Sequence, residues 1–126
     1  MACRSFYLPI PIYNRSLLVM IGRDRKAITS ICNKHHRTYA RKGSVSTLHE
    51  DVLNAMDRYD GLVFSGVGAC PDIMWLCSNR EDILLHELFH VVALIMRKIG
   101  VKLTEESEEA YAYLNQYLFN EVKKKW

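Results

Sequence analysis

The sequence lacks the features that would argue against an ordinary folded domain. It has few prolines and glycines, three and six in 126 residues. No basic start leads into a long apolar run near the N-terminus, so we expect no secretory signal, no membrane span and a cytoplasmic location. The four cysteines form no CxxC pair. We therefore expect free thiols rather than a disulfide framework at Cys3, Cys32, Cys70 and Cys77.

The chain also has no large excess of positive or negative residues, because its formal net charge is only +3. Basic residues do cluster at 34–42 and 123–125, and we interpret both clusters as solvated surface. Nucleic-acid binding through Lys34–Arg37 and Arg41–Lys42 is the less favoured alternative. With 49% hydrophobic and 25% charged residues, the chain is typical of one folded domain spanning residues 1–126.

The hydrophobic pattern predicts an α+β fold. We expect a small antiparallel sheet with an N-terminal hairpin, packed on helices, the last two of which carry the candidate site. Pro9 and Pro11 indicate an edge strand, and Asp24 is a candidate helix cap. The expected strands are 5–13, 16–21, 62–64 and 73–76. The expected helices are 24 to about 35, 46–56, 79–98 and 104 to about 122. We expect the first helix to fray in the polar stretch from His35 to Lys42, which a loop at 42–44 follows. Ser46 or Thr47 is the candidate cap of the second helix.

One motif indicates a chemistry: His86, Glu87 and His90 form an HExxH pentapeptide within the expected helix 79–98. Residues four apart on a helix project from nearly the same side. Two imidazoles so placed can bind one divalent ion, and the glutamate beside them can reach a water on that ion.

The apolar residues of the same helix form one broad stripe, which we expect to face the core. We expect this helix to end at about Lys98, with Gly100 as the glycine that follows its C-terminal end. The two histidines project from the other side, where a cleft could hold a metal. The residues of the stripe are Leu84, Leu85, Leu88, Val91, Val92 and Ile95.

A zinc site needs a third protein ligand. The extended HExxHxxGxxH pattern fails, because Ala93 and Met96 hold the positions of its glycine and third histidine. A glutamate of the last helix is the other common solution. With Ala110, Leu114 and Tyr117 taken as the inward face of that helix, we favour Glu109, keep Glu106 in reserve, and expect Glu105 and Glu108 to point outward.

A second zinc site is conceivable at Cys32, His35 and His36. We favour the simpler interpretation that these three residues belong to a packed or solvated helix terminus. Their spacing alone does not separate the two interpretations.

The HExxH motif followed by Glu109-Ala110 resembles the gluzincins, and the short chain resembles the minimal gluzincins of phages and prophages. The resemblance covers residues 73 to about 117. It implies one Zn²⁺ bound by His86, His90 and Glu109. It also implies a metallopeptidase that hydrolyses a protein or peptide substrate with a metal-bound water, with Glu87 as general base. Strand 73–76 would then be an edge strand that pairs with the substrate, and a core strand with no exposed edge is the alternative that stays equally open.

The sequence also departs from this family. Tyr113 stands where thermolysin-like enzymes carry an aspartate that orients a zinc-binding histidine, so we expect it to act as a hydrogen-bonding neighbour of the site. We expect the group that stabilises the oxyanion to come from His35, His36, His49 or Tyr111. The missing oxyanion group motivates an alternative function, a zinc-stabilised protein-binding module that is catalytically weak or inactive.

Overall fold

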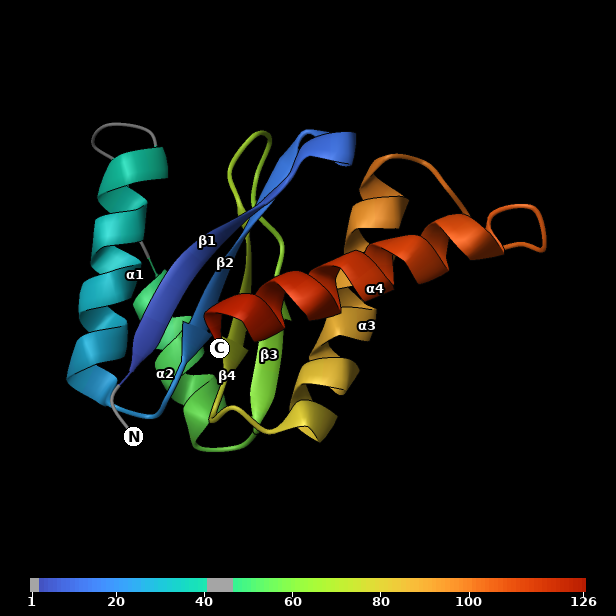
Figure 1. Cartoon of the computed structure of the whole chain (residues 1–126). Coiled ribbons are helices and arrows are strands. Elements are labelled where there is room, and N and C mark those ends of the chain that lie inside the picture. The colour runs from blue at the N-terminus through green and yellow to red at the C-terminus, as the bar shows by residue number, and fades with distance from the viewer. Residues whose placement is uncertain (1–2, 41–46) are drawn as a thin grey trace.

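The computed structural model describes residues 3–40 and 47–126 (Figure 1). The predicted loop at 42–44, the basic residues Arg41 and Lys42, and the candidate cap Ser46 lie outside the described residues. The strands are β1 (Arg4–Ile10), β2 (Arg15–Ile21), β3 (Gly61–Phe64) and β4 (Asp72–Leu76). The helices are α1 (Arg25–Tyr39), α2 (Leu48–Met56), α3 (Glu81–Lys98) and α4 (Glu108–Lys125), and a 3-10 turn (Pro11–Tyr13) closes the hairpin.

The sheet confirms the α+β fold and the N-terminal hairpin, because β1 pairs with β2 in antiparallel fashion. The strand order is β1-β2-β4-β3, so β1 is an edge strand. An edge strand tolerates Pro9, which has no amide hydrogen to donate.

The predicted antiparallel pairing holds for β1 with β2 and for β3 with β4, but the sheet is mixed, because β2 and β4 are parallel. Parallel neighbours need a long crossover connection, and here α1, α2 and β3 lie between the two strands in the chain. Of the two interpretations of strand 73–76, the core strand is confirmed and the edge strand is wrong. β4 has neighbours on both sides, and its five residues are all buried, as expected for an interior strand.

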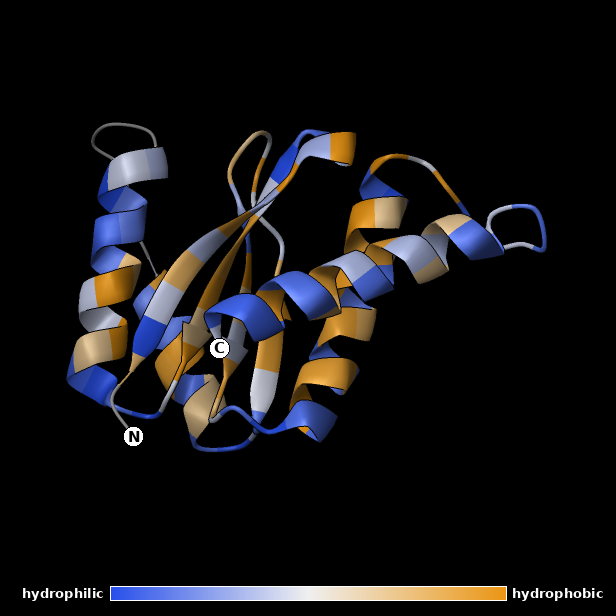
Figure 2. Cartoon of the chain, in the orientation of Figure 1, coloured by the Kyte–Doolittle hydropathy of each residue, from blue (hydrophilic) through white to orange (hydrophobic). Residues whose placement is uncertain are grey.

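The sheet is the middle of three layers. Helices α1 and α2 cover one face, where Leu18, Met20 and Trp75 join one apolar cluster. Helices α3 and α4 cover the other face (Figure 1), where Leu17 and Val19 join a larger cluster. Figure 2 accordingly shows apolar colouring along the strands and over much of α3.

Helix boundaries follow local chemistry. The Asp24 side chain accepts a hydrogen bond from the amide of Ala27 at 3.1 Å, which confirms the predicted cap. The expected fraying from His35 is wrong, because α1 continues to Tyr39. His35 is buried there and lies 2.7 Å from the Tyr7 hydroxyl. Thr47 precedes α2, but its side chain makes no capping hydrogen bond.

The C-terminal end of α3 is fixed to the sheet by a buried carboxylate. Asp72, which has no exposed surface, lies 2.6 Å from Lys98 and 3.4 Å from Arg15. It also accepts a hydrogen bond from the amide of Gly66 at 2.8 Å. Gly100 ends the helix with φ 77°, as predicted. These contacts hold the helix that carries the HExxH motif in one register against the sheet.

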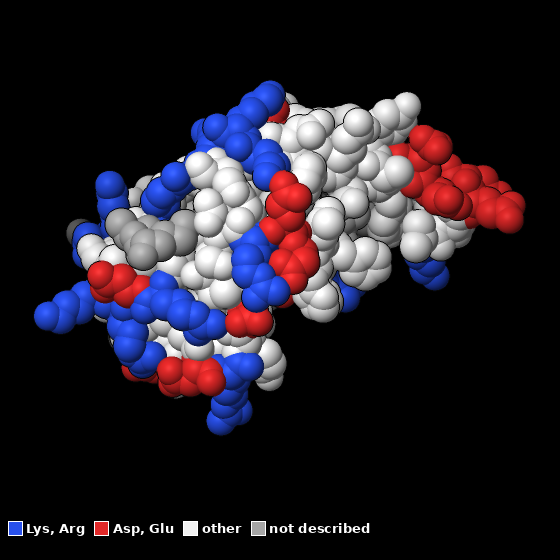
Figure 3. Space-filling view, turned by 60° about the horizontal axis from the view of Figure 1, so that its bottom comes forward, with Lys and Arg blue, Asp and Glu red and all other residues white. Residues whose placement is uncertain are grey.

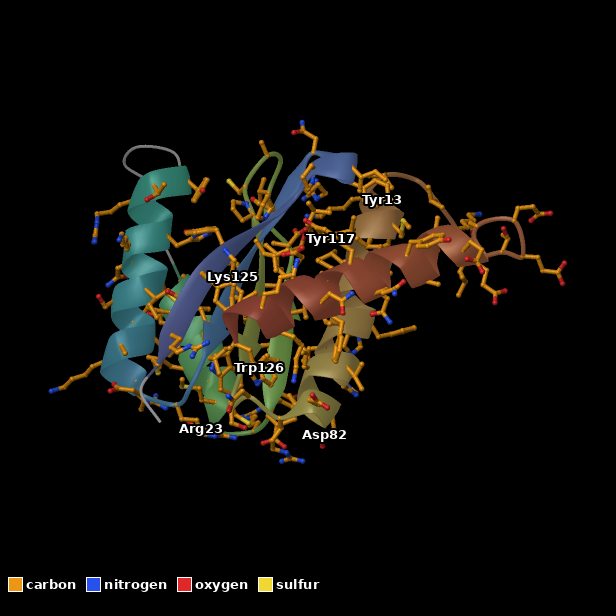
Figure 4. All side chains as sticks on the ribbon, in the orientation of Figure 1. Tyr13, Arg23, Asp82, Tyr117, Lys125 and Trp126 are labelled. Atoms are coloured by element: carbon orange, nitrogen blue, oxygen red, sulfur yellow. The ribbon has the colours of Figure 1, made fainter. Side chains whose placement is uncertain are left out.

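Helix α4 lies across α3 and the hairpin. Its buried residues are Leu114, Leu118 and Val122. The Tyr117 hydroxyl donates to the Pro9 carbonyl at 2.8 Å, which joins α4 to β1 (Figure 4). In the described part of the chain, no helix combines the length and the apolar character needed to cross a membrane.

Candidate metal centre

The two histidines of the motif lie together on the exposed side of α3. The Nε2 atoms of His86 and His90 are 3.3 Å apart. Two nitrogen ligands at ~2.0–2.1 Å from one tetrahedral zinc ion are ~3.3–3.4 Å apart. The pair therefore has the separation of two zinc ligands. The protein-only alternative is a hydrogen bond from the N–H of one neutral ring to the other ring.

Glu87 lies beside this pair, on the side of α3 that faces β3. It is only 6% exposed, and its Oε1 is 3.9 Å from the Nε2 of His86. Burial raises the pKa of Glu87 above its usual value, and the two neighbouring imidazoles oppose that rise. A carboxylate whose pKa is raised accepts a proton more readily near neutral pH.

Gly61, the first residue of β3, provides the space for Glu87. A Cβ atom at this position would lie 2.6 Å from the Cγ of Glu87, closer than two carbon atoms can approach. The sequence indicated only a helix break at Asp60-Gly61, so this packing role was missed. A glycine that begins a short strand is the signal that could have suggested it.

A surface cleft of about 650 Å³ is lined by residues of α3 and of the edge strand β3. The residues of β3 that line it include Gly61, Leu62 and Val63, and those of α3 include His86, Glu87 and His90. We call it the histidine cleft. Its end near His86 adjoins a second hollow, lined in part by Asp60, Arg80 and Asp82.

Tyr59 lines both hollows and was missed by the sequence analysis. Its amide donates to the Ala55 carbonyl at 2.8 Å, which fixes its backbone in the turn between α2 and β3. Its ring is exposed. No pattern marks this tyrosine as functional, because only the packing of the turn on α3 brings it to the cleft.

The structure does not bring the predicted third ligand to the histidines. Within residues 3–40 and 47–126, no group of three His, Cys, Asp or Glu side chains is close enough to hold a metal ion. Glu109 is exposed in the first turn of α4. Its role as a zinc ligand, and that of Glu106 in reserve, stay predictions.

Glu108 is exposed, as expected, and it also lines a hollow with Phe89, Val92 and Ala93 of α3. The predicted inward face of α4 is confirmed, because Leu114 is buried and Ala110 and Tyr117 pack against the core. Leu118 and Val122 extend this buried face. Ala93 lines both this hollow and the histidine cleft.

The predicted neighbours of the site lie elsewhere or make other contacts. The Tyr111 hydroxyl donates to the Val101 carbonyl at 2.5 Å. Tyr113 is exposed on α4, and its role next to a zinc-binding histidine stays a prediction. His36 belongs to α1, on the other face of the sheet, and lines a different hollow with His35 and Tyr39. It is therefore separated from the histidine pair.

The alternative zinc site at Cys32, His35 and His36 is not assembled among the described residues. The Cys32 thiol is buried against the sulfur of Met20 at 3.9 Å, and burial raises its pKa to about 11. His35 faces Tyr7, and burial lowers its pKa. The favoured interpretation, a packed helix terminus, agrees with these contacts.

Comparisons of this chain with protein-family models, with curated proteins and with solved structures find no match. The resemblance to gluzincins therefore depends on the quoted residues alone.

Proposed function

We propose that this chain is a zinc-dependent metallopeptidase that hydrolyses peptide bonds in a protein or peptide substrate. His86 and His90 hold the ion, and a carboxylate from the first turn of α4 completes the site, with Glu109 as the candidate. The observation that carries the proposal is the 3.3 Å separation of the two Nε2 atoms, with the buried Glu87 beside them.

Zinc, when bound, supplies Lewis acidity that polarises a carbonyl group and makes a water molecule easier to deprotonate. Glu87 performs the proton transfer. Its carboxylate accepts a proton from the attacking water and then gives that proton to the leaving amine. Because burial raises the pKa of Glu87, the carboxyl group holds the proton between these two steps more readily than an exposed glutamate would.

The histidine cleft suits an extended peptide. Among the strands of residues 3–40 and 47–126, β3 is the second edge of the sheet, so one side of residues 61–64 has no neighbouring strand there. An extended segment can add to such an edge by backbone hydrogen bonds. β3 thus takes the role that the sequence analysis assigned to strand 73–76.

Tyr59 is our candidate for stabilising the oxyanion. It lines the cleft beside His86 and Glu87, which His35, His36 and His49 do not. A phenol that donates a hydrogen bond to the developing negative charge lowers the barrier to acyl transfer.

The proposal is tested with zinc-loaded chain and a library of peptides, with new peptide ends identified by mass spectrometry. We expect new ends from the wild type and none from Glu87→Gln or after chelation. Glu50→Gln, an exposed residue of α2, is the matched control and should cleave like the wild type. Equal cleavage by Glu87→Gln would show that the mechanism is wrong.

The third ligand is tested by zinc affinity. We expect Glu109→Gln to weaken zinc binding at least tenfold, by analogy with ~10–100-fold losses at residues that support metal ligands. Glu108→Gln is the matched control, because it removes the adjacent charge. If Glu108→Gln weakens binding and Glu109→Gln does not, the assignment of Glu109 is contradicted.

A second candidate function is a zinc-stabilised protein-binding module without turnover. The position of the predicted oxyanion residues favours it, because none of His35, His36, His49 and Tyr111 lines the histidine cleft. It predicts that zinc raises the melting temperature of the chain while no peptide is cleaved. Stoichiometric cleavage of a bound protein, abolished by a chelator, contradicts this candidate.

A further inference from the structure

Helices α3 and α4 leave an apolar groove open to solvent beside the histidine cleft. It has a volume of about 360 Å³, and Phe89, Val92, Ala93, Leu103, Tyr111 and Ala112 line it. We call it the α3–α4 groove. Phe89 is 64% exposed and Leu103 is 59% exposed.

Exposure continues along α3 beyond the groove. Leu85, one helical turn before Phe89, is 51% exposed, although the sequence pattern placed it in the core. Exposed apolar residues scattered singly need no explanation, but neighbours that share one face mark a contact surface. Leu85, Phe89 and Leu103 therefore indicate that this face packs against something outside the described chain.

One end of the groove is strongly acidic. Glu105, Glu106, Glu108 and Glu109 are all exposed where the chain enters α4. Within residues 3–40 and 47–126 none of the four forms an ion pair with Lys or Arg. The space-filling view shows the acidic residues gathered at one end of the molecule, next to a surface with few charges (Figure 3). We call Glu105, Glu106 and Glu108 the glutamate patch, and leave out Glu109 because it is the candidate zinc ligand.

We propose that the α3–α4 groove docks a basic amphipathic protein segment, with its apolar side chains in the groove and its Lys or Arg residues on the glutamate patch. The charge selects this occupant. An anionic membrane surface would be repelled by the patch. The C-terminal lysines of a second copy already have partners within the molecule: Lys123 pairs with Glu81, Lys124 pairs with Glu121, and Lys125 lies over the Phe6 ring. A second copy is an outcome that the test below distinguishes.

The test uses two synthetic peptides that fold as helices with the same leucine face, one with lysines and one with glutamates on the other face. Binding to metal-free chain is measured by fluorescence anisotropy at low and high salt. We expect the lysine peptide to bind at least tenfold more tightly than the glutamate peptide, and salt to reduce that ratio. Equal binding of the two peptides, or no binding of either, overturns the proposal.

Two variants locate the binding surface. Phe89→Ser should weaken binding of the lysine peptide at least fivefold, whereas Ile12→Ser is the matched control, because Ile12 is 79% exposed in the hairpin turn. The double variant Glu105→Lys/Glu106→Lys should shift the preference to the glutamate peptide. Unchanged binding by both variants overturns the docking site. Self-association of the wild type that Phe89→Ser abolishes also overturns it, since a second copy would then be the occupant. Because no zinc is present, these results are independent of the proposed peptidase activity.

Discussion

Gly61 and Glu87 lie so close that a methyl group on the glycine would be 2.6 Å from the Cγ of the glutamate. The edge strand β3 and the HExxH helix α3 therefore pack closely at this point. Because Gly61 has no side chain, the carboxylate of Glu87 can lie buried beside His86. This contact sets the position of the group that we propose as general base.

Gly61→Ala should displace Glu87. We expect a loss of ~1–3 kcal/mol in the free energy of unfolding, because the extra methyl group overpacks a filled site. Peptidase activity should fall as well, since the carboxylate moves from its position beside His86. Chemical denaturation and the cleavage assay measure the two effects.

A double-mutant cycle is the control for that prediction. The three atoms nearest the added Cβ all belong to Glu87, so Gly61→Ala should cost much less in a Glu87→Ala background. An equal cost in both backgrounds would contradict the proposed contact.

Glu87→Gln should stabilise the metal-free chain at high pH. Burial raises the folded-state pKa of Glu87 above its unfolded value. Its contribution to stability is therefore full below the unfolded pKa and is lost as pH rises through the folded pKa. We expect the variant to have a higher melting temperature than the wild type at pH 8, with the difference disappearing near pH 4. A lower melting temperature of the variant at pH 8 would refute this account of the buried carboxyl group.

Tyr59→Phe removes only the hydroxyl that we propose as oxyanion donor. We expect kcat to fall ~10²–10³-fold, as for loss of one donor to a developing oxyanion, with zinc affinity unchanged. Tyr39→Phe is the matched control, because this tyrosine is exposed at the end of α1, on the other face of the sheet. If kcat is unchanged in Tyr59→Phe, the donor is another group.

Asp72→Asn should destabilise the fold. The carboxylate is fully buried between Lys98 and Arg15, and removal of one partner from a buried ion pair costs ~3–5 kcal/mol. Asp57→Asn is the matched control, because its pair with Arg25 is exposed and such pairs contribute ~0–1 kcal/mol. Urea unfolding of the two variants measures both values. Similar small losses would show that Asp72 does not anchor α3.

Local patterns were enough to predict much of this fold. The alternation and prolines of the first 21 residues predicted the hairpin, Asp24 predicted the start of α1, and Gly100 predicted the end of α3. Each depends on near neighbours in the chain. Strand order does not, so the parallel pairing of β2 with β4 and the interior place of β4 could not be read from these patterns.

The candidate site shows the same division. Helical spacing predicted that His86 and His90 share a face, and their Nε2 atoms are 3.3 Å apart. The helix from which the third ligand is predicted follows a separate chain segment, and its position depends on how Leu114, Leu118 and Val122 pack. The hollow that Glu108 lines with Phe89 of α3 could therefore not be predicted from spacing along the chain.

The most direct test of the metallopeptidase proposal is the zinc content of chain purified without chelators, measured by mass spectrometry of the metal together with protein concentration. We predict about one zinc ion per chain, lost in His86→Ala and in His90→Ala but kept in Glu87→Gln. Wild-type chain that takes up no stoichiometric zinc, or that keeps its zinc in both histidine variants, would contradict the proposal.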